Sequence, residues 1–419
     1  MESAYWGKGN IQENLKLNRN VVEMGKKYIY IGYCVPKENE KDASGLSIAG
    51  NKMQLNIIQE LSKYSDMQLY PITIYPCASY PKDKRLIYKK SILKLCNSYS
   101  AIRVGFINIP IGKQMCQIIS TFFTVKSLVR KFPDAEIMTF NMYPQVGTPA
   151  KWIKKIYGNR IVSIVADLPI AIEKKKNIMA NTLMSIFNAT TKKNLTNVDK
   201  AIVLNENAVK CFLTTKNYIV VEGGIEVSPC EKNDFSIVDY VHRESIIVYS
   251  GALVEYNGIY NLIQAMKLVQ ADVTLRIYGD GPLRGIVEEA AREQSKIEYM
   301  GVVSNEQMMQ LQRQAYILIN PRPVDDPISK VTFPSKIFEY LMSGTVVMTT
   351  KLSGFTNEYL DKMFFMDDDP RSIADEIDKC MQIPYEKMND MAVKAHDFVV
   401  EEKSWEIQGK KIHDFLVGM

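Results

Sequence analysis

The segment Phe333–Gly344 reads FPSKIFEYLMSG and is followed directly by the apolar run TVVM. Pro334 suits the first position of a helix, where its missing N–H costs nothing and its φ angle is already set. Gly344 suits the position just after a helix, where a left-handed residue turns the chain. The segment therefore predicts a helix that begins at Pro334 and stops at Gly344, with a buried strand after it.

Three polar side chains stand near the start of this predicted helix. Its N-terminus offers free backbone N–H groups, to which Ser335 adds a hydroxyl and Lys336 an ammonium group, and such a set favours an anion. Glu339 shares a face with Ser335 and is placed to accept a hydrogen bond from a sugar diol. The alternative is a helix capped for stability, with Lys336 in solvent. The segment alone favours neither interpretation.

Length and composition restrict the class of protein. A chain of 419 residues favours two domains, and 46% hydrophobic with 24% charged residues is typical of a soluble globular protein. No apolar run is long enough to span a membrane, and the N-terminus lacks the pattern of a secretion signal, so we expect a protein that is not secreted. The seven scattered cysteines include no Cys-x-x-Cys pair, which indicates reduced thiols and no zinc site.

The formal charge of +5 conceals an asymmetry. Residues through Glu222 contain 32 Lys and Arg against 16 Asp and Glu, whereas residues from Gly223 contain 20 against 31. A basic half suggests anionic lipid headgroups, a phosphorylated acceptor or nucleic acid as its partner. Nucleic acid is the least favoured of these, because no recognisable binding motif accompanies the charge.

The N-terminal half predicts a flexible arm at residues 1–24 and one domain at 25–222. Lys27–Val35 has the pattern of a buried strand, and the turn-rich segment after it contains Gly45 and Gly50. These glycines serve either a ligand-binding loop or only the turn. Further strand-like runs lie at residues 69–75, 104–109, 136–141, 161–166 and 201–204. The helical patterns between them predict a parallel, doubly wound sheet.

The segment 173–200 has an apolar stripe at Met179, Leu183, Ile186 and Phe187, with lysines at both of its ends. A basic amphipathic helix can lie on an anionic membrane surface. The alternative, which is slightly favoured, is an ordinary helix that packs this stripe on the domain core.

The C-terminal half repeats the alternation of strands and helices. Residues 223–244 predict a linker, and residues 245–400 predict a second doubly wound domain. Residues 401–419 predict a helix that packs back on the N-terminal domain. Neither half contains a Gly-x-Gly-x-x-Gly fingerprint or a phosphate-binding P-loop.

Motifs in the C-terminal half resemble those of the retaining glycosyltransferases of family 4, which have the GT-B fold of two Rossmann-like domains facing each other across a cleft. The resemblance covers most of residues 246–370 and extends only loosely to the N-terminal half. Its carriers are VYSGAL at 248–253, RIYGDGP at 276–282, NPR at 320–322, FPSKIFEYLMSG at 333–344 and GFTNEYL at 354–360. The combination of PSK with EYLMSG is similar to members that assemble surface polysaccharides.

The resemblance implies a nucleotide-sugar site in the C-terminal domain. Glu339 would bind the ribose, and Ser335, Lys336 and Arg322 would face the diphosphate. The implied donor-binding set is Gly251, Tyr278, Gly279, Gly301, Arg322, Ser335, Lys336 and Glu339. The acceptor-side residues are Gly45, Gly50 and Asp167, and the catalytic groups are Asp167, Lys336 and Glu339.

The sequence also departs from the family pattern. The first of the family's two glutamates falls on Val331, and its basic pair falls on Ala252 and Asn257. A family histidine falls on Ala166, next to Asp167. Because no histidine precedes His242, a histidine-assisted mechanism is not available from the N-terminal half. Asp167 is either an acceptor-side group or a strand-end carboxylate that caps the next segment.

These observations predict a retaining glycosyltransferase that moves a sugar from a nucleoside-diphosphate sugar to a lipid-linked or growing saccharide acceptor. We expect no cofactor, no metal and no nucleic acid partner. We expect a peripheral position on the cytoplasmic face of the cell membrane, held there through the basic N-terminal domain. The alternatives are a non-catalytic GT-B partner subunit and a nucleotide-sugar epimerase.

Overall fold

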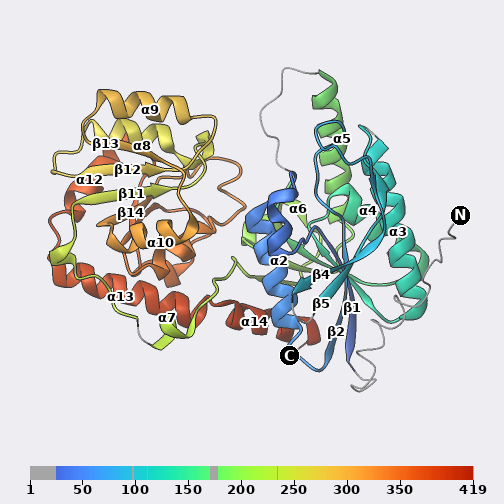
Figure 1. The fold of residues 1–419 in the computed structure, drawn as a ribbon. Helices are drawn as coiled ribbons and strands as arrows, with labels where there is room; N and C mark the ends of the chain where they lie inside the picture. Colours follow the sequence, from blue (N-terminus) through green and yellow to red (C-terminus); the bar gives the residue numbers. More distant parts are fainter. Residues whose placement is uncertain (1–24, 97–98, 111, 170–177, 234, 419) are drawn as a thin grey trace, which may run out of the picture.

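The computed structural model describes residues 25–96, 99–110, 112–169, 178–233 and 235–418, so the predicted arm at 1–24 lies outside the described residues. Each half of the chain contains one large sheet with helices packed against it, and the two halves lie next to each other (Figure 1). Both halves are α/β, as the alternating pattern of strands and helices predicts.

The N-terminal sheet has the order β10-β9-β8-β7-β1-β2-β5-β4. Its strands are β1 (Lys26–Gly32), β2 (Met67–Thr73), β4 (Ser91–Cys96), β5 (Tyr99–Arg103), β7 (Glu136–Phe140), β8 (Ile161–Val165), β9 (Lys200–Val203) and β10 (Tyr218–Val220). All pairs are parallel except β4 with β5. The order reverses between β1 and β7, so a crevice forms there at the carboxyl ends of the strands.

Helices cover both faces of this sheet. They are α2 (Ile48–Leu61), α3 (Gly112–Lys131), α4 (Pro144–Tyr157), α5 (Ile178–Leu195) and α6 (Glu206–Phe212), with a 3-10 helix η1 (Lys37–Asp42). Helix α4 packs between α3 and α5, and α2 packs against the C-terminal helix α14 (Trp405–Val417) (Figure 1). The strands between these layers are apolar along their length, because a parallel sheet covered on both faces is buried on both.

Two local predictions for the N-terminal half are wrong. The strand predicted at 104–109 is only β6 (Phe106–Ile107), which pairs antiparallel with β3 (Ile87–Tyr88) outside the main sheet. A Cβ on Gly105 would lie 2.9 Å from the Lys90 nitrogen, so this glycine lets the chain pass close to that backbone. Gly50 lies inside α2 rather than in a loop, because Ser47 caps the helix by accepting from its N–H.

The C-terminal sheet has the order β13-β12-β11-β14-β15-β16, and all its pairs are parallel. Its strands are β11 (Ile246–Ser250), β12 (Thr274–Tyr278), β13 (Ile297–Gly301), β14 (Ile317–Asn320), β15 (Val347–Thr350) and β16 (Phe364–Met366). The α-helices are α7 (Pro229–Asn233), α8 (Ile259–Met266), α9 (Arg284–Glu293), α10 (Asn305–Gln314), α11 (Lys336–Met342), α12 (Pro370–Cys380) and α13 (Tyr385–Glu402). Short 3-10 helices are η2 (Tyr240–His242), η3 (Glu255–Asn257) and η4 (Asn357–Tyr359). The order reverses between β11 and β14.

The helix predicted at Pro334 begins two residues later. Ser335 occupies the N-cap of α11 with helical angles, and the Ile337 N–H donates to the Pro334 carbonyl in a tighter first turn. Pro334 therefore precedes the cap rather than following it. The predicted end is correct, because Gly344 has a φ of 71° and a Cβ there would lie 2.5 Å from the Phe235 ring.

The chain crosses between the two domains twice, and the crossings bond to each other. Ile225 forms a bridge with Ser404, and the buried Lys403 lies 2.7 Å from Glu222 and 2.9 Å from Glu358. Beyond this junction, α14 packs on the N-terminal domain, where His413 Nε2 lies 2.9 Å from an Asp66 oxygen. One ammonium group thus links an N-terminal strand end to the C-terminal domain.

Replacing Lys403 with Met should destabilise the protein by about 3–5 kcal/mol, because Glu222 would stay buried without a partner. The double variant Lys403→Met with Glu222→Gln removes both charges and should recover most of that loss. Urea unfolding of the two variants and the wild type measures the difference. Equal stability of the single variant and the wild type would contradict a structural role for this ion pair.

Candidate functional site

The candidate site in the C-terminal domain lies where the strand order reverses. Gly251 directly follows β11, Gly279 follows β12, Gly301 ends β13 and Arg322 follows β14. In an open parallel sheet, the carboxyl ends of the strands on both sides of the reversal frame a crevice that binds ligands. The structure therefore brings these predicted donor-binding residues to one edge.

Close backbone packing explains the glycines at this edge. A Cβ on Gly251 would lie 2.7 Å from Lys336 Nζ, and one on Gly279 would lie 1.9 Å from the Gly251 carbonyl oxygen. Both residues, and Gly301 with them, have positive φ angles that other residues adopt at a cost. Tyr278 differs from its prediction, since its side chain is buried in an apolar cluster while its carbonyl accepts from the Gly251 N–H.

Lys336, the first residue of α11, points back to the end of β11. Its Nζ donates to the Ser250 carbonyl at 3.1 Å and lies 4.3 Å from the centre of the Tyr249 ring. Burial, together with the charge of Arg322, lowers the pKa of this ammonium group to about 7. The protonated form of Lys336 is therefore less stable here than it would be in water.

Arg322 is the second cation of the site and is 6% exposed. Its guanidinium donates to the hydroxyls of Ser329 and Thr332, each at 3.0 Å, and lies over the Tyr256 ring. Burial lowers the pKa of this group as well. In the described part of the chain, no carboxylate forms an ion pair with Arg322 or with Lys336.

Glu339 and Ser335 are both exposed at this end of α11. The Glu339 carboxylate lies 3.9 Å from Lys52 Nζ of α2, which belongs to the N-terminal domain. Glu339 and Lys52 line a pocket of about 520 Å³ whose other walls include α10 and the segment 225–231. The structure therefore places Glu339 in the cleft between the domains.

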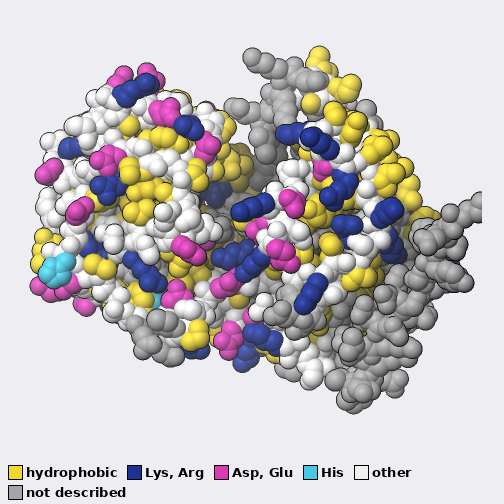
Figure 2. Space-filling model, viewed as in Figure 1, with side chains coloured by type: hydrophobic (Ala, Val, Ile, Leu, Met, Phe, Trp, Pro, Cys, Tyr) yellow, Lys and Arg dark blue, Asp and Glu magenta, His cyan; other side chains and the backbone are white. Residues whose placement is uncertain are grey.

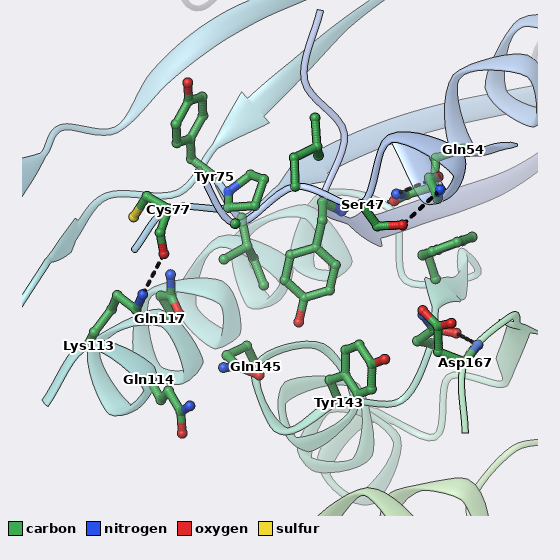
Figure 3. Close-up of a pocket in the computed structure, with 18 of the residues that line it drawn as sticks. Ser47, Gln54, Tyr75, Cys77, Lys113, Gln114, Gln117, Tyr143, Gln145 and Asp167 are labelled. Atoms are coloured by element: carbon green, nitrogen blue, oxygen red, sulfur yellow. Dashed lines mark hydrogen bonds between the residues drawn. The ribbon is translucent and has the colours of Figure 1, made fainter. Parts of the chain in front are cut away.

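A second pocket, of about 360 Å³, lies at the strand-order reversal of the N-terminal sheet (Figure 3). Gly45, Gly50 and Asp167 all line it, so the structure brings together the three predicted acceptor-side residues. Tyr33 after β1 and Tyr143 after β7 supply aromatic walls. Because α2 contributes Gly50 and Gln54 here and Lys52 to the other pocket, one helix borders both.

Asn141 organises the Asp167 corner of this pocket. It is the one described non-glycine residue with a positive φ, 61°. Its Oδ1 accepts from the N–H groups of Ala166 and Asp167 at 2.8 and 2.9 Å, and its Nδ2 donates to the Asp167 carboxylate at 3.2 Å. Desolvation by the surrounding protein raises the pKa of Asp167, although the hydrogen bonds from Tyr143 and Asn141 oppose it. A strained, fully bonded residue of this kind is typical of a functional site.

Amide side chains on another wall were not predicted from the sequence. Gln117 and Gln145 are both more than nine-tenths buried and line the pocket, and the Gln145 Oε1 has no hydrogen-bond partner. Gln114 lies beside them (Figure 3). The sequence could have indicated these residues as pocket-lining, because they lie near the N-terminal ends of α3 and α4. Those helix ends face the carboxyl edge of a parallel sheet. Within the described ranges, no group of three or more metal-ligating side chains is suited to a metal ion.

The comparisons with known proteins agree with this geometry. Residues 244–382 match the family model described as Glycosyl transferases group 1. No curated protein matches the chain in sequence. A solved structure of sucrose-phosphate synthase from Thermosynechococcus elongatus is 15% identical with a TM-score of 0.64, covering 94% of this chain and 98% of that one.

Two further solved structures are similar over the same share of this chain. HepE of Anabaena in complex with UDP-glucose is 13% identical with a TM-score of 0.58, and the trehalose-6-phosphate synthase OtsA is 12% identical with a TM-score of 0.64. The matches cover 94% of this chain, with 100% of HepE and 99% of OtsA. The fold is therefore GT-B, as predicted, and the family match and these neighbours together support a GT-B glycosyltransferase.

The strain at Asn141 predicts an unusual order of stability. Asn141→Gly loses the side-chain hydrogen bonds but adopts the positive φ without strain. Asn141→Ala loses the same hydrogen bonds and is also strained at a positive φ, so the alanine variant should be less stable than the glycine variant by about 1 kcal/mol. Urea unfolding measures this difference. Asn188, inside α5, is the matched control, because there alanine should be more stable than glycine by about 1 kcal/mol. The same order at both positions would contradict the assignment of strain to Asn141.

Proposed function

We propose that the protein is a retaining glycosyltransferase that moves a sugar from a nucleoside-diphosphate sugar to a saccharide or lipid-linked acceptor during surface polysaccharide synthesis. The observation that carries this proposal is the pair of uncompensated cations, Lys336 and Arg322, at the ligand-binding edge of the C-terminal sheet. Arg322 is buried and Lys336 half-buried, and desolvation lowers the pKa of both groups, so an anionic ligand beside them would be favoured.

The chemistry of sugar transfer needs such a pair. When the glycosidic bond to the nucleotide breaks, negative charge grows on the leaving diphosphate, and donors held in place beforehand stabilise it. Lys336 and Arg322 would supply the charge, and Ser335 the hydroxyl, while Glu339 would accept from the ribose hydroxyls. Each such donor typically contributes on the order of 3 kcal/mol to the transition state. The reaction needs no further cofactor or metal in this scheme.

The N-terminal pocket is the proposed acceptor site. Its walls combine the rings of Tyr33 and Tyr143 with the amides of Gln117 and Gln145, a combination that suits an uncharged sugar ring. Among the described residues, Lys113 is the one cation that lines the pocket, and its Nζ already donates to the Cys77 carbonyl. Asp167 would accept a hydrogen bond from the attacking hydroxyl, so its neighbours Asn141 and Tyr143 would set its orientation.

Two alternatives remain as rival proposals. Val331 stands where the family has its first glutamate and is buried, which favours a GT-B subunit that binds a partner without catalysis. An epimerase would need acid and base groups in the cleft. Release of free nucleotide from a panel of sugar nucleotides, with and without membrane extract, separates a transferase from both alternatives, and conversion of one sugar nucleotide into its epimer would identify the epimerase. Release that needs the extract indicates a transferase with a lipid-linked acceptor.

Isothermal titration calorimetry with UDP-glucose, the ligand in the HepE structure's description, tests the donor site first. Lys336→Met and Glu339→Ala should each weaken binding at least about tenfold, because each removes a direct contact to the ligand. Lys379→Ala, an exposed lysine on α12, is the control for loss of one charge and should bind as the wild type does. If UDP-glucose fails, GDP- and ADP-glucose follow, and unchanged binding of every ligand in both variants would refute the site.

The lowered pKa of Lys336 gives a pH dependence with a definite sign. The ammonium form would bind the diphosphate; it is half populated at a pH of about 7 and fully present only well below it. Above that pH, binding must take up a proton, so the affinity for UDP-glucose should fall toward tenfold per pH unit. The diphosphate of a nucleotide sugar does not titrate in this range, and Lys336→Arg should flatten the profile. A flat profile in the wild type would contradict the proposed contact.

A further inference from the structure

The N-terminal domain presents a surface that the proposed transfer reaction does not use. Helices α3, α4 and α5 lie side by side on one side of the sheet, and we call their outer surface the α3–α5 face (Figure 1). Large hydrophobic side chains stand exposed on all three helices. The most informative are Ile119, Phe123, Ile156, Ile178, Leu183 and Ile186, of which Ile178 is 84% and Phe123 60% exposed.

Of the apolar stripe of α5, Phe187 turns inward against Tyr143, but the other residues do not pack on the domain core. The slightly favoured alternative from the sequence is therefore wrong for these residues, because Leu183 and Ile186 are about half exposed. The buried residues of α5 are instead Thr191, Asn194 and Leu195, near its C-terminal end. Lys174–Lys176, the first lysines of that predicted segment, lie outside the described residues. A patch of this kind on a soluble protein marks an interaction surface.

The charges on the same three helices all have one sign. Four Lys and Arg residues lie on α3, three on α4 and two on α5, and these helices contain no Asp or Glu. Asp199 compensates Lys154 at 2.7 Å, but burial and the nearby charge of Lys193 lower the pKa of Lys151. Figure 2 shows hydrophobic side chains gathered over the α5 and α3 side of the domain, with Lys and Arg among them.

We propose that the α3–α5 face binds the surface of an anionic phospholipid bilayer. Apolar side chains that enter the headgroup boundary, surrounded by lysines and arginines, are the two elements of interfacial binding. A protein partner of ordinary composition would meet several basic groups and no acidic one on these helices, whereas a bilayer supplies a continuous negative surface. In the described residues, no helix is long and apolar enough to cross the bilayer.

The position of the face relates it to the acceptor pocket. Gln117 of α3, Gln145 of α4 and Phe187 of α5 all line that pocket, so the same helices form the face and one wall of the pocket. Seated on the bilayer, the face would bring the mouth of the pocket to headgroup level, where the sugar of a lipid-linked acceptor projects. This last step depends on the proposed function, but binding to lipid does not.

Co-sedimentation of the full chain with vesicles tests the proposal without any sugar donor. Vesicles of phosphatidylcholine with about 30% phosphatidylglycerol should retain the protein, and pure phosphatidylcholine should retain much less, because the basic groups need anionic lipid. The triple variant Ile119→Gln, Phe123→Gln, Ile186→Gln should lower the partition coefficient at least about tenfold. The control is the triple variant Tyr260→Gln, Ile286→Gln, Val393→Gln, which removes three exposed hydrophobic side chains from the C-terminal domain. This variant should have the partition coefficient of the wild type.

Circular dichroism and urea unfolding confirm that both triple variants fold. Equal binding by the two variants would place the membrane contact elsewhere and overturn the proposal. Absence of vesicle binding would overturn it as well, and a change in sedimentation velocity of the first variant alone would then assign the face to a protein partner or a second copy. Vesicle binding by the wild type, together with unchanged sugar-nucleotide binding in Lys336→Met and Glu339→Ala, would refute the donor site and leave the α3–α5 face intact.

Discussion

The structure depends on one buried ion pair at the point where the chain passes between its domains. Lys403 and Glu222 lie side by side, and the ammonium nitrogen lies 5.1 and 5.4 Å from the centres of the Tyr359 and Phe398 rings. Each partner would be costly to bury alone, so the two crossings must meet. Because they meet, α14 returns to the N-terminal domain and its residues Trp405, Ile412 and Leu416 join the core beneath β1. The two sheets therefore keep one mutual arrangement at this hinge.

This arrangement determines which side chains face each other across the cleft. Helix α2 of the N-terminal domain lines the acceptor-side pocket with Gln54 and extends Lys52 toward Glu339 of α11. The loop after β9 contributes too, since the Asn205 amide donates to the Lys330 carbonyl at 3.3 Å, in the segment that leads to α11. The cations Lys336 and Arg322, which have no ion-pair partner among the described residues, lie on the C-terminal side of the cleft. Amide side chains and aromatic rings lie in the pocket on the N-terminal side. An anionic donor and an uncharged acceptor would each meet a surface that suits them.

The structure shows where part of the basic excess of the first half lies. The basic excess of the first half includes the outer helices α3, α4 and α5, away from the junction with the second domain (Figure 1). The acidic second half attracts no anion through its overall field, so an anionic ligand would be drawn by local cations. Burial makes Lys336 and Arg322 effective there, because water screens their charges less than it screens exposed ones.

Sequence patterns alone determined the α/β class, the two doubly wound domains and the end of α11 at Gly344. These features follow from local properties, namely continuous apolar strands, helical periodicity and the left-handed turn that a glycine permits. The segment at the start of α11 singled out Lys336 and Glu339 as candidates, and the family resemblance added Arg322; the roles of all three in binding stay predictions.

Only the tertiary structure decided how those residues are used. It placed Gly50 inside a helix, buried the Tyr278 side chain, and revealed Asn141 with its positive φ as the residue that holds Asp167. It also showed that the α5 stripe faces outward rather than into the core. Each of these outcomes depends on contacts between segments far apart in the chain, such as the Asn141 amide with the end of β8. Local pattern carries no information about such partners, because the free energy that selects them comes from packing and burial.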